Sequence, residues 1–335
     1  MKLMSVRVLL LSSLAACAPN NSGNVVGQTC SAISAVTPSP SSLESPFQGT
    51  VFTIVLENKS RSQMFGGSQA PYFQSLAKKY AVADGYTDAH VHPSEPNYIW
   101  MVAGQNFGIL DDDPPAAHHI ASTSHLADQI EAVGKTWKAY QESMGEACKV
   151  VSDGEYAAKH NPFVFFDDIV GWQDGQPLRQ QRCRDHVVDY TQFDVDLAAD
   201  NLPNYVFITP NLINDMHDGS VAQGDAWLAK EVPKILASPA YQNGGVLFIT
   251  ADEGEGRSAT DWTQADDPPF LVVSPLAKSG FVSEIPYDTS SYLKSVQAIL
   301  GVEPLPCGEP GDASPLMDDL FTVPLPSMTA ATPSS

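Results

Sequence analysis

Residues 244–256 read GGVLFITADEGEG, and this stretch decides the fold. The apolar run 246–249 is typical of a buried strand, and it leads directly to two adjacent carboxylates, Asp252 and Glu253, and then to glycines. In an open α/β sheet, ligands bind at the carboxyl ends of the strands. Taken alone, the stretch also fits an acidic turn that closes a core strand.

A second stretch has the same design. Residues 51–58, VFTIVLEN, form an apolar run that ends in Glu57 and Asn58. If the two strands lie in one sheet, Glu57, Asn58, Asp252 and Glu253 come together as hard oxygen ligands, which suit Mg, Ca or Mn. The sequence therefore predicts a divalent metal site.

Further apolar runs alternate with segments of helical periodicity. The predicted strands include 136–143, 204–211 and 270–274. The predicted helices are 71–80, 98–104, 126–133, 225–236 and 290–300. This alternation predicts an α/β fold: three layers, with a largely parallel central sheet and helices on both faces.

The segment 89–104, AHVHPSEPNYIWMVAG, combines a polar first half with an apolar second half. His92, Ser94 and Asn97 lie in the polar half, which we interpret as a loop before the helix 98–104. A serine at the start of a helix lies near backbone N–H groups and a positive dipole, which suit a bound phosphate. It is also the usual helix N-cap, and the same geometry serves both roles.

Two other segments gather polar side chains. His160 precedes a buried aromatic run, where it either faces a substrate or belongs to the core. Asn214, Asp215 and His217 crowd into the segment after the strand 204–211, and Asp215 and His217 are candidates for a second ion. The acidic run 111–113 is expected to be solvated.

Oxygen ligands, a serine and several histidines suit metal-assisted phosphoryl transfer. A divalent ion activates a serine hydroxyl and neutralises charge on the transferred group. A Ser-His-Asp acyl hydrolase would use the same residue types, but no Gly-x-Ser-x-Gly motif surrounds any serine.

Charge and composition limit the partners and the domain organisation. The net charge of −21 over 335 residues argues against nucleic acid, and no internal stretch approaches a membrane span. We expect a Ser/Pro-rich tether over 17–48, a catalytic domain over 49–321 and a disordered tail over 322–335.

The N-terminus has the pattern of an export signal. Lys2 and Arg7 precede a short apolar core, and Leu-Ala-Ala-Cys at residues 14–17 resembles a bacterial lipobox. The resemblance implies removal of residues 1–16, lipidation of Cys17 and attachment to the cell envelope, on its periplasmic or surface side. The lipid would be the sole membrane contact. Plain secretion after cleavage nearby is the alternative.

Four further cysteines suggest disulfides in an exported protein. Cys30, Cys148, Cys183 and Cys307 allow three connectivities. We favour Cys148 with Cys183 and Cys30 with Cys307. Zinc binding is the weaker alternative, because no Cys-x-x-Cys pair occurs.

Seven stretches carry a family resemblance over about residues 50–301. In order they are VLENKS, APYFQSLAKKYAVADGY, HPSEPNY, HNPFVFF, ITPNLINDMHD, GDAWLAKEVPKIL and GGVLFITADEGEG. They resemble the phosphoesterase family of bacterial and fungal acid phosphatases and phosphatidylcholine-type phospholipases C, in the alkaline phosphatase superfamily.

The resemblance implies a role for each motif residue. It implies a metal on Glu57, Asn58, Asp252 and Glu253, with Ser94 as a metal-bound nucleophile that becomes a phosphoserine. His160 and His217 would lie near the phosphate, supported by His92 and Asn97, with Asn214 and Asp215 on the same side. The metal could also be zinc, which the superfamily often uses.

One position departs from the family. The family commonly has a histidine in a Tyr-x-His-Tyr-Ser-Leu-Leu-Arg pattern, where this chain has YDTSSYLK and Thr289. The resemblance favours an acid phosphatase acting on small phosphate esters. A phospholipase C acting on phosphatidylcholine-type lipids is the alternative, although those relatives tend to be much longer. Thr289 supports a third hypothesis, that the protein is a non-catalytic surface lipoprotein that binds phosphate esters.

Overall fold

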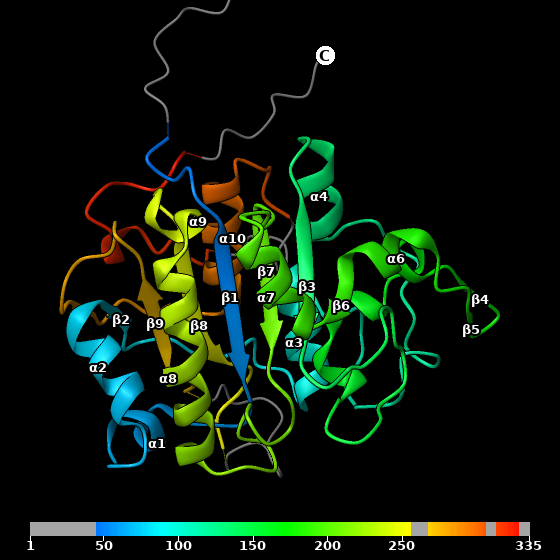
Figure 1. Cartoon of the computed structure of the whole chain (residues 1–335), viewed down its shortest axis with the longest axis horizontal. Helices are drawn as coiled ribbons and strands as arrows, with labels where there is room; N and C mark the ends of the chain where they lie inside the picture. Colours follow the sequence, from blue (N-terminus) through cyan, green and yellow to red (C-terminus); the bar gives the residue numbers. More distant parts are fainter. Residues whose placement is uncertain (1–44, 256–266, 306–312, 328–335) are drawn as a thin grey trace, which may run out of the picture. The chain divides into compact units, whose positions relative to one another are not determined.

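The computed structural model describes residues 45–255, 267–305 and 313–327. An eight-stranded sheet forms its centre (Figure 1). In sheet order the strands are β10 (Val282–Ser283), β2 (Ala81–Ala83), β9 (Phe270–Val273), β8 (Val246–Ala251), β1 (Val51–Leu56), β7 (Tyr205–Thr209), β3 (Trp137–Gln141) and β6 (Val187–Asp189). A separate two-stranded ribbon contains β4 (Trp172–Gln173) and β5 (Gln176–Pro177).

The prediction of a largely parallel sheet is confirmed, with one exception. Strand β9 runs antiparallel to both of its neighbours, β2 and β8, and the other paired strands of the sheet are parallel. An apolar run such as 270–273 looks the same in either direction, so the pattern could not reveal this reversal. The short strands β2, β6 and β10 were not predicted, because two or three residues carry too little periodicity.

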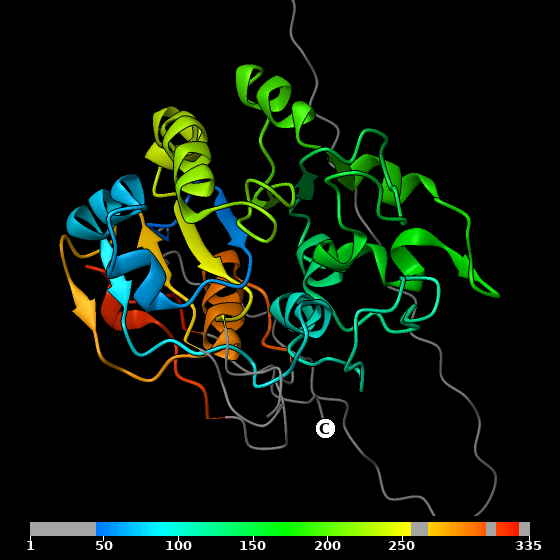
Figure 2. The same ribbon diagram turned by 90° about the horizontal axis from the view of Figure 1, so that it is seen from below.

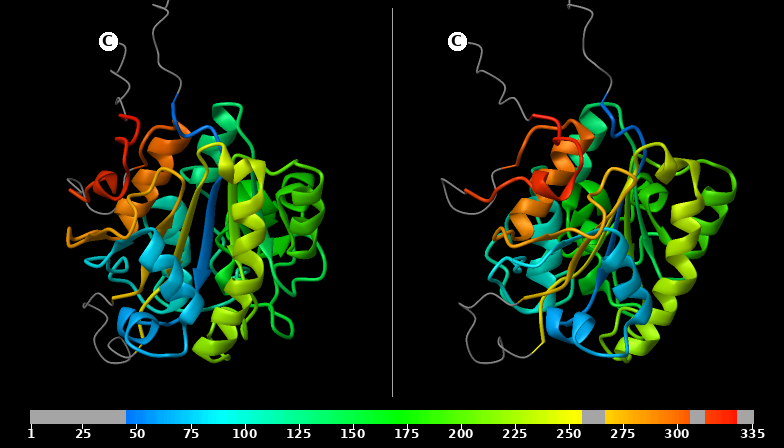
Figure 3. Two further views of the ribbon diagram at one scale, coloured as in Figure 1. Left: turned by 60° about the vertical axis from the view of Figure 1, so that its left-hand side comes forward. Right: turned by 90° about the vertical axis from the view of Figure 1, so that its left-hand side faces the viewer.

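Helices cover both faces of the sheet. They are α1 (Arg61–Phe65), α2 (Pro71–Lys79), α3 (Ser94–Ala103), α4 (Leu126–Ala132), α5 (Asp167–Val170), α6 (Gln181–His186), α7 (Thr191–Ala198), α8 (Val221–Ala237), α9 (Pro239–Gln242) and α10 (Thr289–Leu300), with 3-10 turns η1 (Ala158–His160), η2 (Pro162–Val164) and η3 (Asp318–Leu320). Helices α2 and α8 pack together on one face, and α3 and α10 pack together on the other (Figures 2 and 3). The predicted three-layer fold is confirmed.

The central strands β1, β7 and β8 are buried along their whole length. Their few polar side chains have partners, as buried polar groups require. The hydroxyl of Tyr292 on α10 lies 2.8 Å from Thr53 Oγ1 of β1 and 3.0 Å from Tyr205 Oη of β7. These contacts fix α10 across the strands that carry the candidate site.

The register of β1 and β8 places their last residues side by side. Leu56 pairs with Ala251, so the next residues, Glu57 and Asp252, emerge at the same edge of the sheet. The Asp252 N–H donates to the Leu56 carbonyl at 3.1 Å, which extends the pairing beyond the strands. Because β7 is also parallel to β1, the loop after β7 begins at this edge too (Figure 1).

Helix α3 begins earlier than the sequence predicted. It starts at Ser94, and Pro93 occupies the N-cap, so Ser94 is the first helical residue and neither a loop residue nor the cap. Residues 94–97 look like a loop in the sequence, yet all four are buried because the first turn of α3 packs into the site. Pro96 is tolerated there because N–H groups in the first turn have no intrahelical partner.

Two domain boundaries also need correction. Phe47, placed in the tether, is 6% exposed, and its ring lies 5.5 Å from that of Phe321. Residues 322–327, placed in the disordered tail, are held by hydrogen bonds: Thr322 N–H donates to Leu276 O at 2.8 Å, and Leu325 N–H donates to Asp318 Oδ1 at 2.6 Å. Leu325 is buried as well. Composition underestimated this packing because Ser, Thr and Pro also occur in ordered loops.

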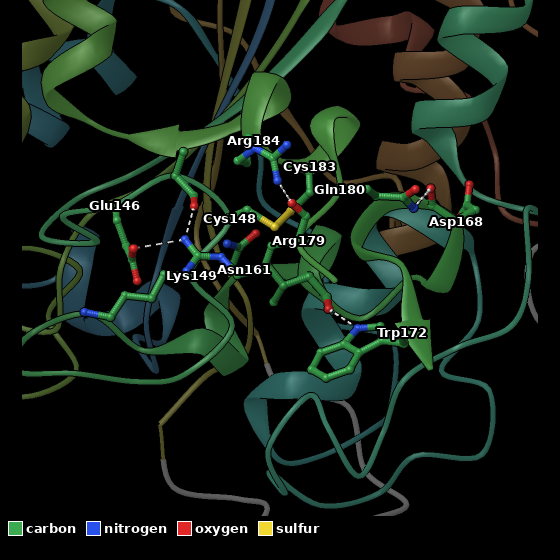
Figure 4. Close-up of a disulfide and its surroundings, with 12 residues drawn as sticks. Glu146, Cys148, Lys149, Asn161, Asp168, Trp172, Arg179, Gln180, Cys183 and Arg184 are labelled. Atoms are coloured by element: carbon green, nitrogen blue, oxygen red, sulfur yellow. Dashed lines mark hydrogen bonds and ion pairs between the residues drawn. A yellow bond between two sulfur atoms is a disulfide. The ribbon is translucent and has the colours of Figure 1, made fainter. Parts of the chain in front are cut away.

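One disulfide lies within the described residues and has the favoured pairing. Cys148 and Cys183 are joined across a sequence separation of 35 residues (Figure 4). Arg179 supports the bridge region by contacting Ala147 O at 2.6 Å and Glu146 Oε2 at 3.1 Å. Cys30, Cys307, Cys17 and the export signal lie outside the described residues.

Removing this disulfide is expected to lower the free energy of unfolding by roughly 3–4 kcal/mol, because the bridge restricts the unfolded chain. The Cys148→Ala/Cys183→Ala double variant should show this loss as a lower urea midpoint. Dithiothreitol should then cause little further loss in the double variant. A double variant with the midpoint of the wild type would contradict a stabilising role.

Candidate functional site

Acidic side chains from three strand ends meet beside the first turn of α3. Glu57 follows β1, Asp252 and Glu253 follow β8, and Asp215 lies in the loop after β7; all four are buried. The Ser94 hydroxyl approaches two of them, at 3.1 Å from Glu57 Oε2 and 3.5 Å from Glu253 Oε1. The structure thus brings the predicted nucleophile among the predicted metal ligands.

Asn58 completes the turn that follows β1. Its φ of 47° lies in the left-handed region, which asparagine tolerates better than most residues. Its N–H donates to Asp252 Oδ1 at 3.2 Å, and its side-chain amide donates to Glu57 Oε2 at 3.3 Å. The residue therefore links the carboxylates that follow β1 and β8.

His160 lies on the other side of Glu57. Its Nε2 is 3.3 Å from Glu57 Oε1, and its Nδ1 is 3.4 Å from Asp215 Oδ2. The ring of His217 lies 5.6 Å from that of His160, and potential ligand atoms of Glu57, His160 and His217 all lie within 4.8 Å of one another. His217 is 30% exposed and contacts Asp218 Oδ1 at 2.7 Å. It therefore links the buried cluster to solvent.

His92 and Asn97 contact Glu253. His92 Nδ1 lies 2.5 Å from Glu253 Oε2, and the Asn97 amide donates to the same oxygen at 3.3 Å and to Val91 O at 2.6 Å. Both side chains thus orient a candidate metal ligand.

Asn214 contacts residues outside the carboxylate cluster. Its amide donates to Glu142 Oε2 at 2.9 Å, and its N–H donates to Asn211 Oδ1 at 3.0 Å. These contacts shape the loop that carries Asp215 and His217. Within that loop, the backbone N–H of His217 donates to Asp215 Oδ1 at 2.7 Å.

Burial and mutual repulsion act on the charges of this cluster. Burial, together with the charges of Asp252 and Asp215, raises the pKa of Glu57 well above its ordinary value. Burial and the neighbouring Glu253 do the same to the pKa of Asp252, and burial raises the pKa of Asp215 to about 7. Burial lowers the pKa of His160, which favours its neutral form. Protein groups alone therefore leave the ionised carboxylates poorly compensated.

Several buried polar atoms in the cluster make no hydrogen bond, although such groups are nearly always paired. These atoms are Glu57 Oε1, Asp252 Oδ2, Asp215 Oδ2, His160 Nε2 and Asn97 Oδ1. Carboxylate and amide oxygens with a neutral imidazole form a donor set that divalent cations accept. The residues present therefore fit a divalent cation.

Sequence reasoning missed three residues beside the cluster. Tyr98 stacks on His160 with ring centroids 5.2 Å apart, Lys159 carries a positive charge that acts on Glu57 and Asp252, and Lys59 is 8% exposed and donates to Asn58 O at 3.0 Å. Tyr98 lies four residues after Ser94, hence on the same helix face. Each lysine lies next to a predicted site residue in the sequence. These sequence positions are the signals from which the three residues could have been predicted.

Thr289, where the family resemblance led us to expect a histidine, is the first residue of α10 and is 2% exposed. The hydroxyl of Tyr86 donates to Thr289 Oγ1 at 3.4 Å. Thr289 thus contacts Tyr86 in the interior of the protein.

Gly219 closes the loop that carries Asp215 and His217. A Cβ added there would overlap the carbonyl oxygen and carbon of Ile213, so Gly219→Ala must displace backbone. Overpacking costs typically about 1–3 kcal/mol, and we expect a lower melting temperature together with weaker activity. Gly67→Ala is the control, because the nearest atom to its added Cβ is Gln63 O at 3.8 Å. Equal melting temperatures for the two variants would contradict the role given to Gly219.

The chain matches a known protein family over most of its length. The model of a family described as the Phosphoesterase family matches residues 47–303. A phosphatidylinositol-3-phosphatase of Mycobacterium tuberculosis is 34% identical over 209 residues, which cover 62% of this chain and 64% of that protein. An acid phosphatase of Aspergillus fumigatus is 31% identical over 173 residues, covering 49% of this chain and 36% of that protein. The matched segment spans less than two thirds of each relative.

A solved structure shares the fold. A protein in the alkaline phosphatase superfamily from Vibrio parahaemolyticus superimposes with a TM-score of 0.52 at 12% identity, covering 81% of this chain and 72% of that chain. At this identity, the likeness concerns the fold alone. It agrees with the predicted alkaline-phosphatase-like architecture.

Proposed function

Because the chain belongs to the Phosphoesterase family, we propose that it hydrolyses phosphate monoesters at Ser94, as an acid phosphatase does. The observation that carries the proposal is the place of the Ser94 hydroxyl. It lies within 3.5 Å of carboxylate oxygens of Glu57 and Glu253, in a buried cluster in which five other polar atoms make no hydrogen bond. A serine that served only helix α3 would need no such surroundings.

Glu57, Asn58, Asp252 and Glu253, together with Ser94, would hold a divalent cation. When bound, the cation would lower the pKa of the serine hydroxyl and neutralise charge on the phosphoryl group. Mg, Ca and Mn suit the oxygen ligands, and His160 and His217 would allow Zn as well. If a second ion were bound, Asp215 and His217 would hold it beside Glu57, and solvent instead of His217 would then protonate the leaving group.

The protein side chains would divide the reaction into two steps. Ser94 Oγ attacks phosphorus while its proton passes to Glu57 Oε2, the acceptor of its hydrogen bond in the structure. The bond from phosphorus to the ester oxygen breaks, and the leaving alkoxide takes a proton from His217, which reaches solvent. Water then attacks the phosphoserine and gives a proton to His217, while Glu57 returns its proton to the Ser94 oxygen as the bond from that oxygen to phosphorus breaks. Phosphate leaves, and both side chains regain their starting protonation.

The remaining polar side chains would hold groups in place. Neutral His160, with its Nδ1 next to Asp215, would hold a phosphoryl oxygen. His92 and Asn97 would act through Glu253, which both of them contact.

The relatives' names support the proposed substrate class. The two relatives described above are named as phosphatases, one of them for a phosphatidylinositol phosphate, which favours phosphate monoesters over the diester bond of phosphatidylcholine. The test is phosphate release from p-nitrophenyl phosphate alongside diacylglycerol release from phosphatidylcholine micelles. We expect turnover of the first substrate and none of the second. Turnover of the lipid alone would instead indicate a phospholipase C, and phosphate-ester binding without any turnover would indicate a binding protein.

Export and lipid anchoring complete the proposal. Residues 1–16 would be the signal peptide, Cys17 the lipidated residue, and the following residues a tether to the catalytic domain. Among the residues that the structure describes, no helix has both the length and the apolarity needed to span a bilayer. Cells grown with labelled palmitate should label the wild type but not Cys17→Ser, and equal labelling of the two would rule out this anchor.

A further inference from the structure

A second cluster of potential ligands lies in the loop between α3 and α4. One ligand atom from each of Asp111, Asp113 and His118 lies within 4.8 Å of the other two. His118 Nε2 is 3.1 Å from Asp111 Oδ1. The two aspartates are exposed, whereas the His118 side chain is 16% exposed. The cluster is therefore open to solvent on one side.

Glu95 lies buried behind this cluster. Its side chain is 0% exposed, its Oε1 is 2.6 Å from His118 Nδ1, and its Oε2 has no hydrogen-bond partner. The negative charges of Asp111, Asp112 and Asp113 all act on this carboxyl. Lys159 compensates Asp112, at 2.7 Å from Asp112 Oδ2. The charge of Lys159 also acts on Glu95. Within the described residues, however, no lysine or arginine forms an ion pair with Asp111 or Asp113, whose only such partner is His118 at Asp111.

We propose that Asp111, Asp113 and His118 form a second divalent-cation site, separate from the Ser94 centre, with Glu95 as its positioning residue. Metal-binding histidines almost always present their other ring nitrogen to a carboxylate or carbonyl, which fixes the tautomer and the ring orientation. Glu95 has this relation to His118, since it contacts Nδ1 and leaves Nε2 facing the aspartates.

The donor set indicates the class of cation. One imidazole nitrogen and two carboxylates suit Zn²⁺ or Mn²⁺, whereas Ca²⁺ and Mg²⁺ prefer oxygen ligands only. Three protein ligands at an exposed loop leave further coordination positions for water. Zn²⁺ is therefore the probe of choice.

A third cluster with similar residue types shows the contrast. His125, Asp128 and Asp168 also lie within ligand distance of one another. There, however, the guanidinium of Arg182 contacts Asp128 Oδ1 and Asp168 Oδ2, each at 2.5 Å. A resident arginine already supplies the positive charge, and the Asp111 cluster has no equivalent within the described residues.

The proposed site adjoins the catalytic helix. Glu95 follows Ser94 directly, and its backbone N–H donates to Asp112 Oδ1 at 3.0 Å. A cation on Asp111, Asp113 and His118 would therefore tie the loop to the first turn of α3. The proposal concerns binding at the loop and does not depend on catalysis at Ser94.

Zinc bound per chain, measured by equilibrium dialysis and metal analysis, tests the proposal. His118→Gln should bind one Zn²⁺ fewer than the wild type. The single variant Asp252→Asn and the double variant Asp252→Asn/His118→Gln both have an impaired Ser94 centre. The double variant should again bind one Zn²⁺ fewer per chain than the single variant. His119→Gln is the matched control, because this neighbouring histidine contacts Asp167 instead. Equal zinc binding by His118→Gln and the wild type, or an equal loss in His119→Gln, would overturn the proposal.

Two further variants separate ligand binding from folding. Asp113→Asn alters an exposed side chain, so it should keep the melting temperature of the wild type but weaken zinc binding at this site about 10-fold or more. Glu95→Gln should weaken zinc affinity roughly 10–100-fold while keeping the site count at saturating zinc. If His118 were instead an imidazolium shared by Glu95 and Asp111, neither variant would change zinc affinity, and the proposal would be wrong.

Discussion

Ser94→Ala is expected to lower the rate of p-nitrophenyl phosphate hydrolysis on the order of 10⁴-fold or more, the scale seen when a covalent nucleophile is removed. The Ser94 hydroxyl contacts both Glu57 and Glu253, and alanine offers no atom that can attack phosphorus. The variant should fold, because Pro93 and not Ser94 occupies the N-cap of α3 and alanine favours helices. Initial rates at saturating substrate measure the effect.

A control serine distinguishes lost chemistry from lost packing. Ser274 is 2% exposed, like Ser94, but its hydroxyl donates to Gly245 O at 2.8 Å, away from the carboxylates. Ser274→Ala should lose some stability and keep its turnover number. Acid quenching with ³²P-labelled substrate should label the wild type at Ser94. Turnover by Ser94→Ala at the wild-type rate would show that water, and not Ser94, attacks phosphorus.

Chelation is expected to abolish turnover and to lower the melting temperature. Without a cation, Glu57, Asp252, Glu253 and Asp215 remain buried together, and the unpartnered atoms Glu57 Oε1 and Asp252 Oδ2 lose their compensation. A cation at 100 times its dissociation constant would add about 2.7 kcal/mol to the free energy of unfolding. Calorimetry with EDTA, and after addition of each metal, measures this difference.

Asp252→Asn is expected to change the melting temperature in opposite directions without and with metal. The folded-state pKa of Asp252 lies well above its ordinary value, so the ionised form at neutral pH opposes folding, and this cost fades as the pH falls. An uncharged asparagine removes the cost while still accepting the Asn58 N–H. In EDTA we therefore expect Asp252→Asn to melt higher than the wild type. With metal present the order should reverse, because the variant has lost a ligand.

Asp225→Asn is the control for a buried aspartate outside the site. Asp225 accepts the N–H groups of Tyr72 and Phe73 at 3.0 and 2.8 Å, at the start of α2. It should respond to EDTA as the wild type does. If Asp252→Asn also responded to metal as fully as the wild type, Asp252 would not be a ligand.

Local pattern predicted the elements on which the site is built. The apolar runs ending at Glu57 and Asp252 are strands β1 and β8, and the helical periods near 71–80, 225–236 and 290–300 are α2, α8 and α10. Side-chain periodicity follows directly from strand and helix geometry, so a single sequence carries it. The place of the carboxylates at strand ends followed from the same pattern.

Only the tertiary structure shows which residues contact each other when they are far apart in the sequence. The direction of β9 depends on how the chain returns to the sheet, and an apolar run does not record it. Asn214 meets Glu142, 72 residues away, although its sequence neighbours Asp215 and His217 made it a candidate for the phosphate side. Glu95 contacts His118, which is 23 residues away in the sequence. The buried carboxyl group of Glu95 therefore lies close to the acidic run 111–113, which the sequence predicted to be solvated.

The sequence by itself therefore determined the fold class, the strand ends and the residue types at the site. Tertiary structure decided which atoms meet: the Ser94 hydroxyl with Glu57, His160 between Glu57 and Asp215, and Tyr98 stacked on His160. The physical reason is one of range. Periodicity is set by bonds along the chain, whereas hydrogen bonds and ion pairs require atoms from distant segments to come within about 3 Å of each other.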